Sequence, residues 1–419
     1  MRAPPEHLYA HFVPQVNKLR TALSGGLGGD TAPPSPVRLR TALTLFFALD
    51  GFLFAGWVVR IPAIKHQTGA TASTLGLALL GVSAGAVITM MLTGRLCRRY
   101  GSHAVTVACG VLLSLSIALP AQTDSALTLG LVLLLFGAAY GGMNVAMNSA
   151  AVDLVTAMRR PVMPSFHAAF SLGGMAGAGL GGLVAGSLSP ATHLLALTGI
   201  GLLVTAAVGP VLLGSRDAAP PPPEQHTGTS ERPRRMSPGA RRIVVLFGVI
   251  ALCTAYGEGA LAEWGALHLS QDLNAAPGLA AAGYSLFALT MAIGRLSGTI
   301  LLERFGQTRT LVAGGATAAA GMLLGALAPA VWLALLGFAV AGLGLANIFP
   351  VAVGRAGALA GPSGVAAAST LGYGGMLLGP PVIGFLADWF SLPVALTTVT
   401  VLAATAAVLG YAARNAANT

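Results

Sequence analysis

The sequence predicts an all-α integral membrane protein in which twelve transmembrane helices form two parallel repeats of six. Charged residues make up only 9% of the 419-residue chain, against 55% hydrophobic residues. Apolar runs of about 20 residues, the length that crosses a bilayer as a helix, recur along the chain. Because hydrocarbon offers no hydrogen-bond partners to the backbone, we expect each of these runs to be a spanning helix.

Twelve apolar runs can be placed, and one polar gap divides them into two sets of six. The first set covers approximately residues 41–63, 72–94, 103–121, 125–152, 165–188 and 191–213. The second set covers approximately residues 243–267, 276–302, 309–328, 329–353, 363–387 and 391–413. An even number of spans places both termini on the same side of the membrane.

Two hydrophilic segments accompany these spans. The first 38 residues are polar, with Pro and Gly clusters and no apolar core of a secretory signal, which indicates a disordered tail. The second segment contains four consecutive prolines and six arginines, a composition typical of an unfolded linker. The expected organisation is therefore a cytoplasmic tail at 1–38, an N-terminal bundle at 39–214, a cytoplasmic linker at 215–242 and a C-terminal bundle at 243–414.

The positive charges are distributed asymmetrically. With the N-terminus inside, 20 of the 23 Lys and Arg residues fall in cytoplasmic segments, and only Arg60 and Lys65 fall outside. Such asymmetry orients membrane proteins, so we expect both termini in the cytoplasm and the chain in the inner (cytoplasmic) membrane. A basic cytoplasmic face suits anionic lipid headgroups, so the net charge of +10 requires no nucleic-acid partner.

The two halves share short similarities at a nearly constant offset. The motif FAGW at 54–57 corresponds to LAEW at 261–264, and RRYG at 98–101 corresponds to ERFG at 303–306. Since both halves start inside and contain six spans, we expect parallel repeats related by an axis along the membrane normal. This arrangement predicts a central cavity between the halves, near the midplane of the membrane.

The segment 94–101 (GRLCRRYG) resembles the Gly-x-Leu-x-Asp-Arg-x-Gly signature of the major facilitator superfamily, and the resemblance extends from about Arg40 to Arg414. In that family the charges of this loop latch neighbouring helix ends in one state of the transport cycle. The gating residues that the resemblance implies are Arg95, Arg98, Arg99, Glu303 and Arg304. Arg98 stands where the family has an acid, whereas Glu303 keeps the acid in the second half.

Four further motifs resemble one subgroup of that family, the YbjJ- and MosC-like proteins, which are distantly similar to fucose permeases. These motifs are WVVRIPAI at 57–64, MNVAMN at 143–148, MPSFHAAFS at 163–171 and EGALAEW at 258–264. The resemblance implies a secondary carrier that is not an enzyme and has no cofactor. It favours sugar-like or cyclitol-like solutes.

Asp50 is the deepest acidic residue of the first span. It lies about nine residues from the start, or ~14 Å at 1.5 Å per residue, close to the middle of a ~30 Å hydrocarbon core. A charge at this depth is unfavourable, so an acidic residue found there is expected to have a structural or functional role. Asp50 is expected either to exchange a proton or contact substrate in a cavity, or to be a structural acid hydrogen-bonded between helices.

Trp57 lies two helical turns beyond Asp50, on the same helix face. Its indole could stack on a sugar-like ring in the cavity, or it could anchor the helix at the outer interface. Trp264 occupies the matching position of the second half, which favours a paired role for the two indoles.

Glu258 and Glu263 lie in the outer half of the seventh span. Glu258 is the better candidate for substrate binding and proton coupling. Glu263 points about 140° away around the helix and is expected to be a solvated rim residue, a gate, or a partner of Arg60 or Lys65.

Each of the other polar residues in the spans has two possible roles. Asn144 and Asn148 share a face of the fourth span, and Asn347 lies in the tenth span. Their amides could bind hydroxyl-bearing solutes or join helices to each other. His167 could take part in a proton route or bridge helix ends. Arg295 could extend toward the membrane surface or face the cavity.

These observations predict a secondary active transporter that moves a small-molecule substrate by alternating access, coupled to protons, in a monomer. One alternative is proton-antiport efflux of small amphipathic compounds. Another is a membrane-embedded sensor that binds a ligand without flux. Catalysis is disfavoured because no metal cluster and no nucleophile with a paired base are evident, and Cys97, Cys109 and Cys253 have no metal-ligand spacing.

Overall fold

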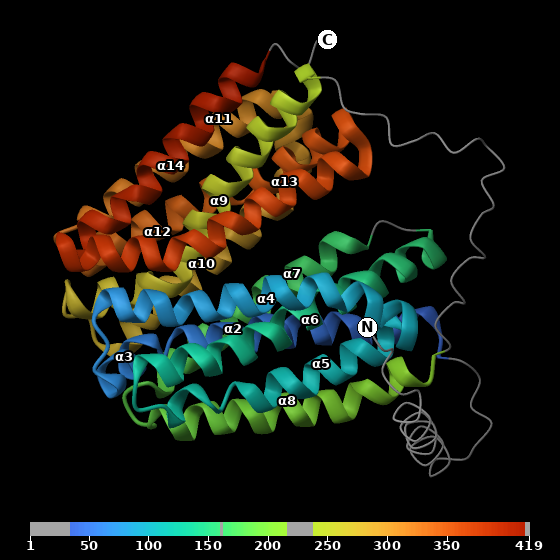
Figure 1. Ribbon diagram of the computed structural model, residues 1–419, viewed down its shortest axis with the longest axis horizontal. Coiled ribbons are helices and arrows are strands. Elements are labelled where there is room, and N and C mark those ends of the chain that lie inside the picture. The colour runs from blue at the N-terminus through green and yellow to red at the C-terminus, as the bar shows by residue number, and fades with distance from the viewer. Residues whose placement is uncertain (1–33, 160–161, 216–237, 415–419) are drawn as a thin grey trace, which may run out of the picture.

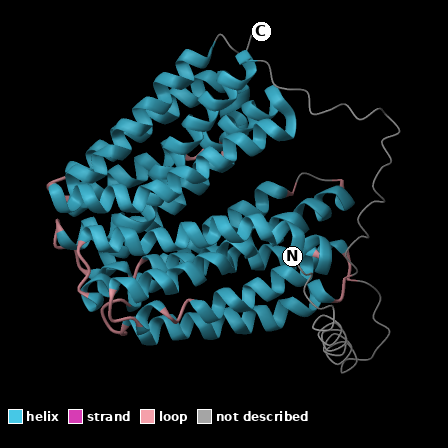
Figure 2. Ribbon diagram, in the orientation of Figure 1, coloured by secondary structure: helices cyan, strands magenta, loops and turns pink. Residues whose placement is uncertain are grey.

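The computed structural model describes residues 34–159, 162–215 and 238–414, and the described residues form helices and short connections without a strand (Figures 1 and 2). Almost all of the expected tail, and the linker from residue 216 to 237, lie outside the described residues. Several helices begin at a Ser or Thr cap, such as Ser125, whose hydroxyl accepts from the Thr128 backbone N–H. This capping satisfies one of the unpaired N–H groups of the first turn.

The described helices follow the chain in two groups. The N-terminal group consists of α2 (Pro36–Val58), α3 (Ile61–Thr68), α4 (Ala72–Tyr100), α5 (Ser102–Ser116), η2 (Pro120–Gln122), α6 (Ala126–Met158), α7 (Met163–Val184) and α8 (Pro190–Leu213). The C-terminal group consists of α9 (Pro238–Gln271), α10 (Pro277–Leu296), α11 (Gly298–Leu327), α12 (Val331–Leu345), α13 (Ile348–Trp389) and α14 (Leu392–Ala412).

The membrane spans do not coincide one by one with these helices. Eleven described segments are long and apolar enough to cross a membrane, among them 331–361 and 363–389, which divide α13 at a kink. Two described helices lie outside these segments: α3, with only eight residues, and α7, whose 22 residues are rich in glycine. At about 1.5 Å per residue α7 is long enough to cross the ~30 Å core, so we assign it as the twelfth span.

Two boundaries differ from the sequence-based expectation. The first span ends at Val58 rather than near residue 63, because a turn at Arg60 starts the separate short helix α3 with Pro62 in its first turn. The expected loop around Cys97 is instead helical, since α4 continues to Tyr100. The chain then turns at Gly101, which has φ 87°, and the corresponding Gly306 turns with φ 74°.

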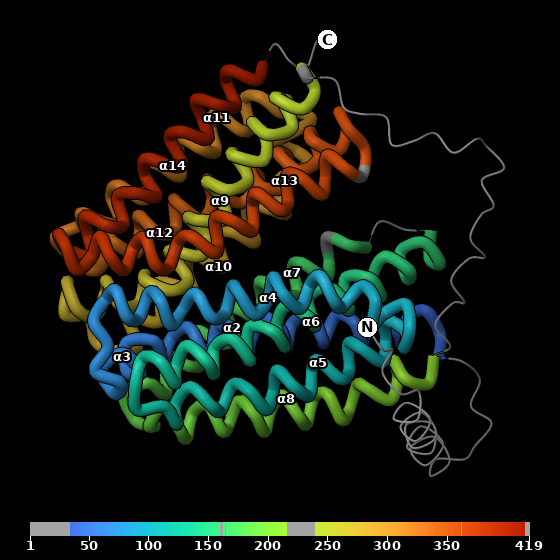
Figure 3. Tube along the Cα trace, in the orientation of Figure 1, coloured from blue at the N-terminus to red at the C-terminus, as the bar shows by residue number. Residues whose placement is uncertain are grey.

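Figure 1 shows the two groups close together where α3 and α10 lie, and diverging toward the opposite end. We call these ends the α3 end and the Gly101 end. The groups contact each other mainly through α4 with α13 and α7 with α10, and the tube in Figure 3 traces the same arrangement. Each contact pairs one helix from each half, as expected for two parallel repeats.

Close packing within the N-terminal group depends on glycine. An added Cβ at Gly173 or Gly177 of α7 would collide with the backbone carbonyls of Ala48 or Phe52 on α2. The glycine-rich run of α7 therefore brings these two helices together, as the spacing of small residues predicts.

Candidate functional site

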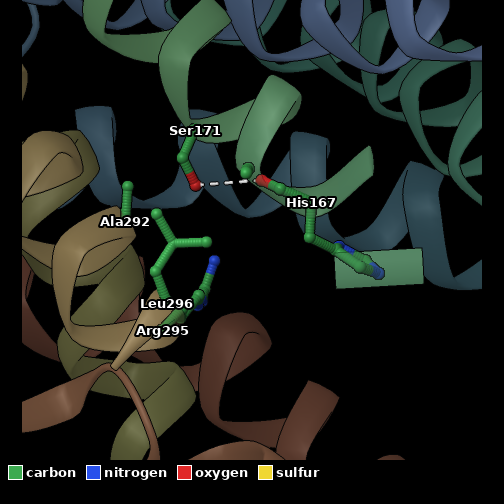
Figure 4. A pocket seen from close by; sticks show the side chains of 6 residues that line it. His167, Ser171, Ala292, Arg295 and Leu296 are labelled. Carbon is green, nitrogen blue, oxygen red and sulfur yellow. Dashed lines mark hydrogen bonds between the residues drawn. The ribbon is translucent and has the colours of Figure 1, made fainter. Parts of the chain in front are cut away.

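A small pocket of about 70 Å³ lies between α7 and α10 (Figure 4). Its lining residues are His167, Ala168, Ser171, Ala292, Arg295 and Leu296. Ser171 donates a hydrogen bond of 3.2 Å to the backbone carbonyl of His167. In Figure 4 Arg295 extends from α10 into the space beside α7, whereas the His167 ring turns away from Ser171. Residues from both halves of the chain therefore line the pocket.

Arg295 forms an ion pair beside this pocket. Its Nη2 donates to Glu258 Oε2 on α9 at 3.2 Å, and the two side chains are 32% and 26% exposed. Arg295 was expected either to extend toward the membrane surface or to face the cavity. In the structure it faces the space between the halves. Because both side chains remain partly accessible, their charged ends can meet a solute or water.

His167 lies near the start of α7 and is exposed. Its ring meets Phe47 of α2 edge to face, with the ring centroids 5.6 Å apart. This position places a titratable group next to the pocket and to the first span.

Asp50 is completely buried in α2. Neither of its carboxylate oxygens has a hydrogen-bond partner among the described residues. The structure therefore shows neither a structural acid hydrogen-bonded between helices nor a carboxylate that is open to a cavity. An ionised carboxylate in such surroundings would be strongly unfavourable, so the geometry suits a neutral, protonated Asp50.

An aromatic chain runs through both groups next to Asp50. Successive ring centroids lie 6.4, 6.5, 5.1, 6.5 and 6.2 Å apart in the order Trp57, Phe136, Tyr140, Phe54, Tyr284 and Phe287. The contact between Phe54 and Tyr284 joins α2 to α10 and thus one half to the other. Offset and edge-to-face pairs of this kind stabilise an interface beyond their buried area.

Two tyrosines of this aromatic chain were not identified from the sequence. Tyr140 stacks on Phe54 with the ring centroids 5.1 Å apart, and Phe54 meets Tyr284 edge to face at 6.5 Å. Isolated tyrosines in apolar spans give no periodic signal, and only the packing of α2, α6 and α10 links these two.

The two tryptophans are core residues. Trp57 is 1% exposed and packs near Phe136, and Trp264 is 0% exposed. In this structure Trp57 is neither an indole anchored at the membrane interface nor a ring open to a solute, because the surrounding helices enclose it. Its link to the site runs through the aromatic chain.

The three asparagines lie in different surroundings. Asn148 Nδ2 donates to the Asn144 carbonyl at 2.7 Å, and both side chains are partly exposed. Asn347 is 9% exposed and donates to the Gly294 carbonyl of α10 at 2.8 Å. The contact of Asn347 joins two helices, whereas Asn144 keeps an amide that is accessible to a solute.

Arg60 and Glu263 do not pair in this structure. Arg60 Nε donates to His193 Nδ1 at 2.8 Å, and its Nη1 donates to the Ala185 carbonyl at 3.3 Å. Glu263 is 7% exposed, and its Oε2 has no hydrogen-bond partner among the described residues. The expectation of a solvated rim residue is therefore wrong for Glu263, because α9 turns it into the protein.

The residues of the signature motif lie on the surface at the Gly101 end. Exposed side chains there are Arg95, Arg98, Arg99, Glu303 and Arg304. Arg99 lies over the ring of Tyr100 at 5.3 Å. Within the described residues, no ion pair links the two signature motifs. The two halves thus approach each other elsewhere, at the α3 end.

These features define a polytopic α-helical membrane protein with a polar site between two six-helix halves. The sequence model of the Major Facilitator Superfamily matches residues 42–264 and 247–418. The chain belongs to the Major Facilitator Superfamily. This membership confirms the predicted fold and identifies a membrane transporter rather than an enzyme.

Relatives with similar sequences cover most of the chain. An uncharacterized MFS-type transporter of Yersinia pestis is 33% identical over 367 residues, which are 87% of this chain and 92% of the relative. Membrane protein MosC of Rhizobium meliloti is 30% identical over 383 residues, or 90% of each chain. The match to MosC confirms the subgroup that the four motifs indicated.

Solved structures share the fold at low sequence identity. A mutant of the nucleoside transporter NupG gives a TM-score of 0.70 at 16% identity, covering 89% of this chain and 98% of the other. A bacterial homolog of the human lysosomal transporter Spinster, inward-facing and occupied, gives 0.70 at 15% identity, covering 92% and 98%. At these identities the likeness supports the fold alone.

Proposed function

We propose that this transporter moves a small hydroxyl-bearing solute, of the sugar or cyclitol type, across the cytoplasmic membrane by alternating access coupled to protons. The supporting observation is the partly exposed Arg295–Glu258 pair, which lies between the halves next to the inter-half pocket. Alternating access exposes such a site first to one side of the membrane and then to the other. A monomer is sufficient for this mechanism, because each chain contains both halves.

The positive-inside rule assigns the Gly101 end to the cytoplasm, together with both termini. The two groups diverge toward this end in Figure 1. The described conformation is accordingly interpreted as inward-facing, with the α3 end closed. In that state the signature-motif charges of the two halves would be apart, as their exposed positions suggest.

Asp50 is the proposed proton carrier. A completely buried carboxyl without a hydrogen-bond partner is more stable in its neutral form. It is expected to ionise only when its surroundings change. Rocking of the two halves would supply that change. His167, which lines the pocket, and Glu258 of the ion pair would pass the proton to the cytoplasmic side.

The experiment that tests this proposal has two parts. Detergent-purified protein is first screened by thermal shift against sugars, cyclitols, amino sugars and antibiotics, since a ligand that binds the folded state raises the melting temperature. Flux of the hit is then measured in proteoliposomes with and without a proton gradient. Asp50→Asn should abolish uphill uptake but retain exchange, whereas Asp124→Asn, at an exposed acid, should behave as wild type. Unchanged uphill uptake by Asp50→Asn would remove this residue from the coupling mechanism.

Efflux of amphipathic compounds is the second candidate function. The aromatic chain through Phe54 and Tyr140 favours it, because apolar rings offer stacking surfaces to compounds that lack hydroxyl groups. Hits confined to amphipathic antibiotics, together with increased drug susceptibility of a deletion strain, would select this function over solute uptake.

A further inference from the structure

Asp388, near the end of α13, joins the two halves at the α3 end of the molecule. Its Oδ1 accepts a hydrogen bond of 3.0 Å from the Ala72 backbone N–H, and its Oδ2 accepts one of 2.8 Å from the Ser73 N–H. The Ser73 hydroxyl also donates to Oδ2. One carboxylate of the C-terminal half thus holds the first turn of a helix from the N-terminal half.

The first turn of α4 depends on this contact for two of its hydrogen bonds. The first N–H groups of a helix have no carbonyl partner in a preceding turn. In α4, the hydroxyl of the N-cap residue Thr71 accepts from the Thr74 N–H at 3.2 Å. The N–H groups of Ala72 and Ser73 bind Asp388 instead. Protein atoms therefore satisfy these two N–H groups only when the two halves touch.

The Asp388 carboxylate lies at one end of a longer contact between the two halves. We call this contact, formed by residues 72–83 of α4 and 376–388 of α13, the α4–α13 seam. The backbones approach without intervening side chains, because an added Cβ at Gly76 would meet the Pro380 carbonyl and one at Gly384 would meet the Ala72 carbonyl. Further along, the Ser83 hydroxyl donates to the Met376 carbonyl at 3.1 Å. Asp388 lies at the exposed end of this seam, where water can replace it when the halves separate.

The second inter-half contact, between α7 and α10, shows no such carboxylate among the described residues. There the Ser285 hydroxyl donates to the Met175 carbonyl at 3.4 Å. The N-terminus of α10 has no side-chain cap within the described part of the chain. Among the described residues, a charged side chain therefore holds the α3 end at the α4–α13 contact and not at the α7–α10 contact.

We propose that Asp388 is a conformational latch that stabilises the state in which the two halves meet at the α3 end, by capping α4 across the halves. A negative charge at a helix N-terminus is favoured by the partial positive charge of the unpaired N–H groups. At the opposite end, no ion pair links the two signature motifs among the described residues. The difference between the ends favours closure at the α3 end, and alternation requires release of Asp388.

Hydrogen–deuterium exchange of the full-length protein tests this latch without a known substrate. Asp388→Asn should increase exchange in α4 around Ala72 and also in the other inter-half contact, around 179–182 and 278–285. Loss of a capping group shifts such an equilibrium by roughly 2- to 10-fold, which sets the expected change in exchange rate. Peptides at the Gly101 end should become more protected, because that end closes as the α3 end opens.

Two outcomes would overturn the proposal. Exchange that increases only at 71–75 would mean that Asp388 is a local cap without effect on the equilibrium between states. Unchanged exchange would mean that the contact contributes nothing. Asp124→Asn, an exposed acid at the same end, is the matched control and should change neither region. If Asp388→Asn does not fold, Ser73→Ala removes one of the three hydrogen bonds and should show the same pattern at smaller amplitude.

Discussion

At the scale of single residues, the ion pair and one buried acid stand out. Glu258 and Arg295 neutralise each other across α9 and α10, whereas Asp50 has no hydrogen-bond partner among the described residues. A buried acid without a partner in a membrane protein is unfavourable for stability. This cost is why we look to function for the role of Asp50.

Replacing one member of the Glu258–Arg295 ion pair should lower the stability of the protein more than replacing both members. Glu258→Gln or Arg295→Gln leaves a partly buried charge without its partner, so each should lower stability, by about 1 to 3 kcal/mol. The double variant should recover part of the loss. Melting temperatures of the four proteins in one detergent give the coupling between the two changes. Additive losses would show that the pair makes no net interaction.

Removing tyrosine hydroxyls should weaken solute binding without unfolding the protein. Tyr140→Phe and Tyr284→Phe keep the rings and each remove one hydroxyl that could bond to a ligand, so the affinity for a polyhydroxylated ligand should fall about 2- to 10-fold. Isothermal titration measures it. Tyr256→Phe is the matched control, because that phenol already bonds to Thr398 at 2.9 Å within the C-terminal half. Its loss should affect stability and spare binding.

At the scale of elements, glycine decides where helices turn and how closely they pack. Gly101 and Gly306 occupy the same place in the two signature motifs and both have positive φ. Gly173 and Gly177 allow α7 to lie against the backbone of α2. The repeat is therefore visible in backbone conformation as well as in sequence.

Alanine at either turn glycine should destabilise the protein. At φ 87° and 74°, a Cβ adds about 1 to 2 kcal/mol of strain per residue. Gly101→Ala and Gly306→Ala should each lower the melting temperature. The control Gly199→Ala lies inside α8 with open space around its Cβ, and it should be neutral or stabilising. Equal effects at all three positions would contradict the strain argument.

Two neighbouring glycines of α7 offer a sharper test of packing. A Cβ at Gly173 would collide with the Ala48 carbonyl, whereas a Cβ at Gly174 would find its nearest atom, the Gly51 carbonyl oxygen, at an ordinary 3.7 Å. Gly173→Ala should therefore lower stability, by about 1 to 3 kcal/mol, and Gly174→Ala should not. The yield of monodisperse protein in gel filtration and the melting temperature measure the difference.

At the scale of the whole molecule, the two halves act as bodies that meet through narrow seams. Since α4 with α13 and α7 with α10 form the main contacts between them, a covalent link across one seam should hold one state. A link inside one half should leave alternation free.

The cysteine pair Gly179→Cys and Ser285→Cys should form a disulfide that stops transport until it is reduced. The Cβ of residue 179 would lie 3.8 Å from the Ser285 hydroxyl, which suits such a bond. The control Gly142→Cys faces native Cys109 within the N-terminal half. Its disulfide should leave flux of the screened solute unchanged. Transport that continues through the oxidised 179–285 pair would exclude a rocking motion at this seam.

The sequence by itself determined that this chain crosses the membrane twelve times in two related halves. Apolar length and the absence of charge are properties of each segment alone, because the bilayer imposes the same requirement on every span. Asp50 and Glu258 could be singled out for the same reason. The short helix α3 was missed, because a Pro near a span boundary has several local solutions.

Tertiary structure alone decided which of the polar groups meet. Asp388 of the C-terminal half reaches Ser73 of the N-terminal half over 315 positions, a contact that depends on how the two six-helix groups pack. Packing within each group decided the other contacts: it enclosed Trp57 beside Phe136, buried Glu263 and brought Arg295 of α10 to Glu258 of α9. The depth of a residue in the membrane follows from its own span, whereas its partners are decided only when the helices pack.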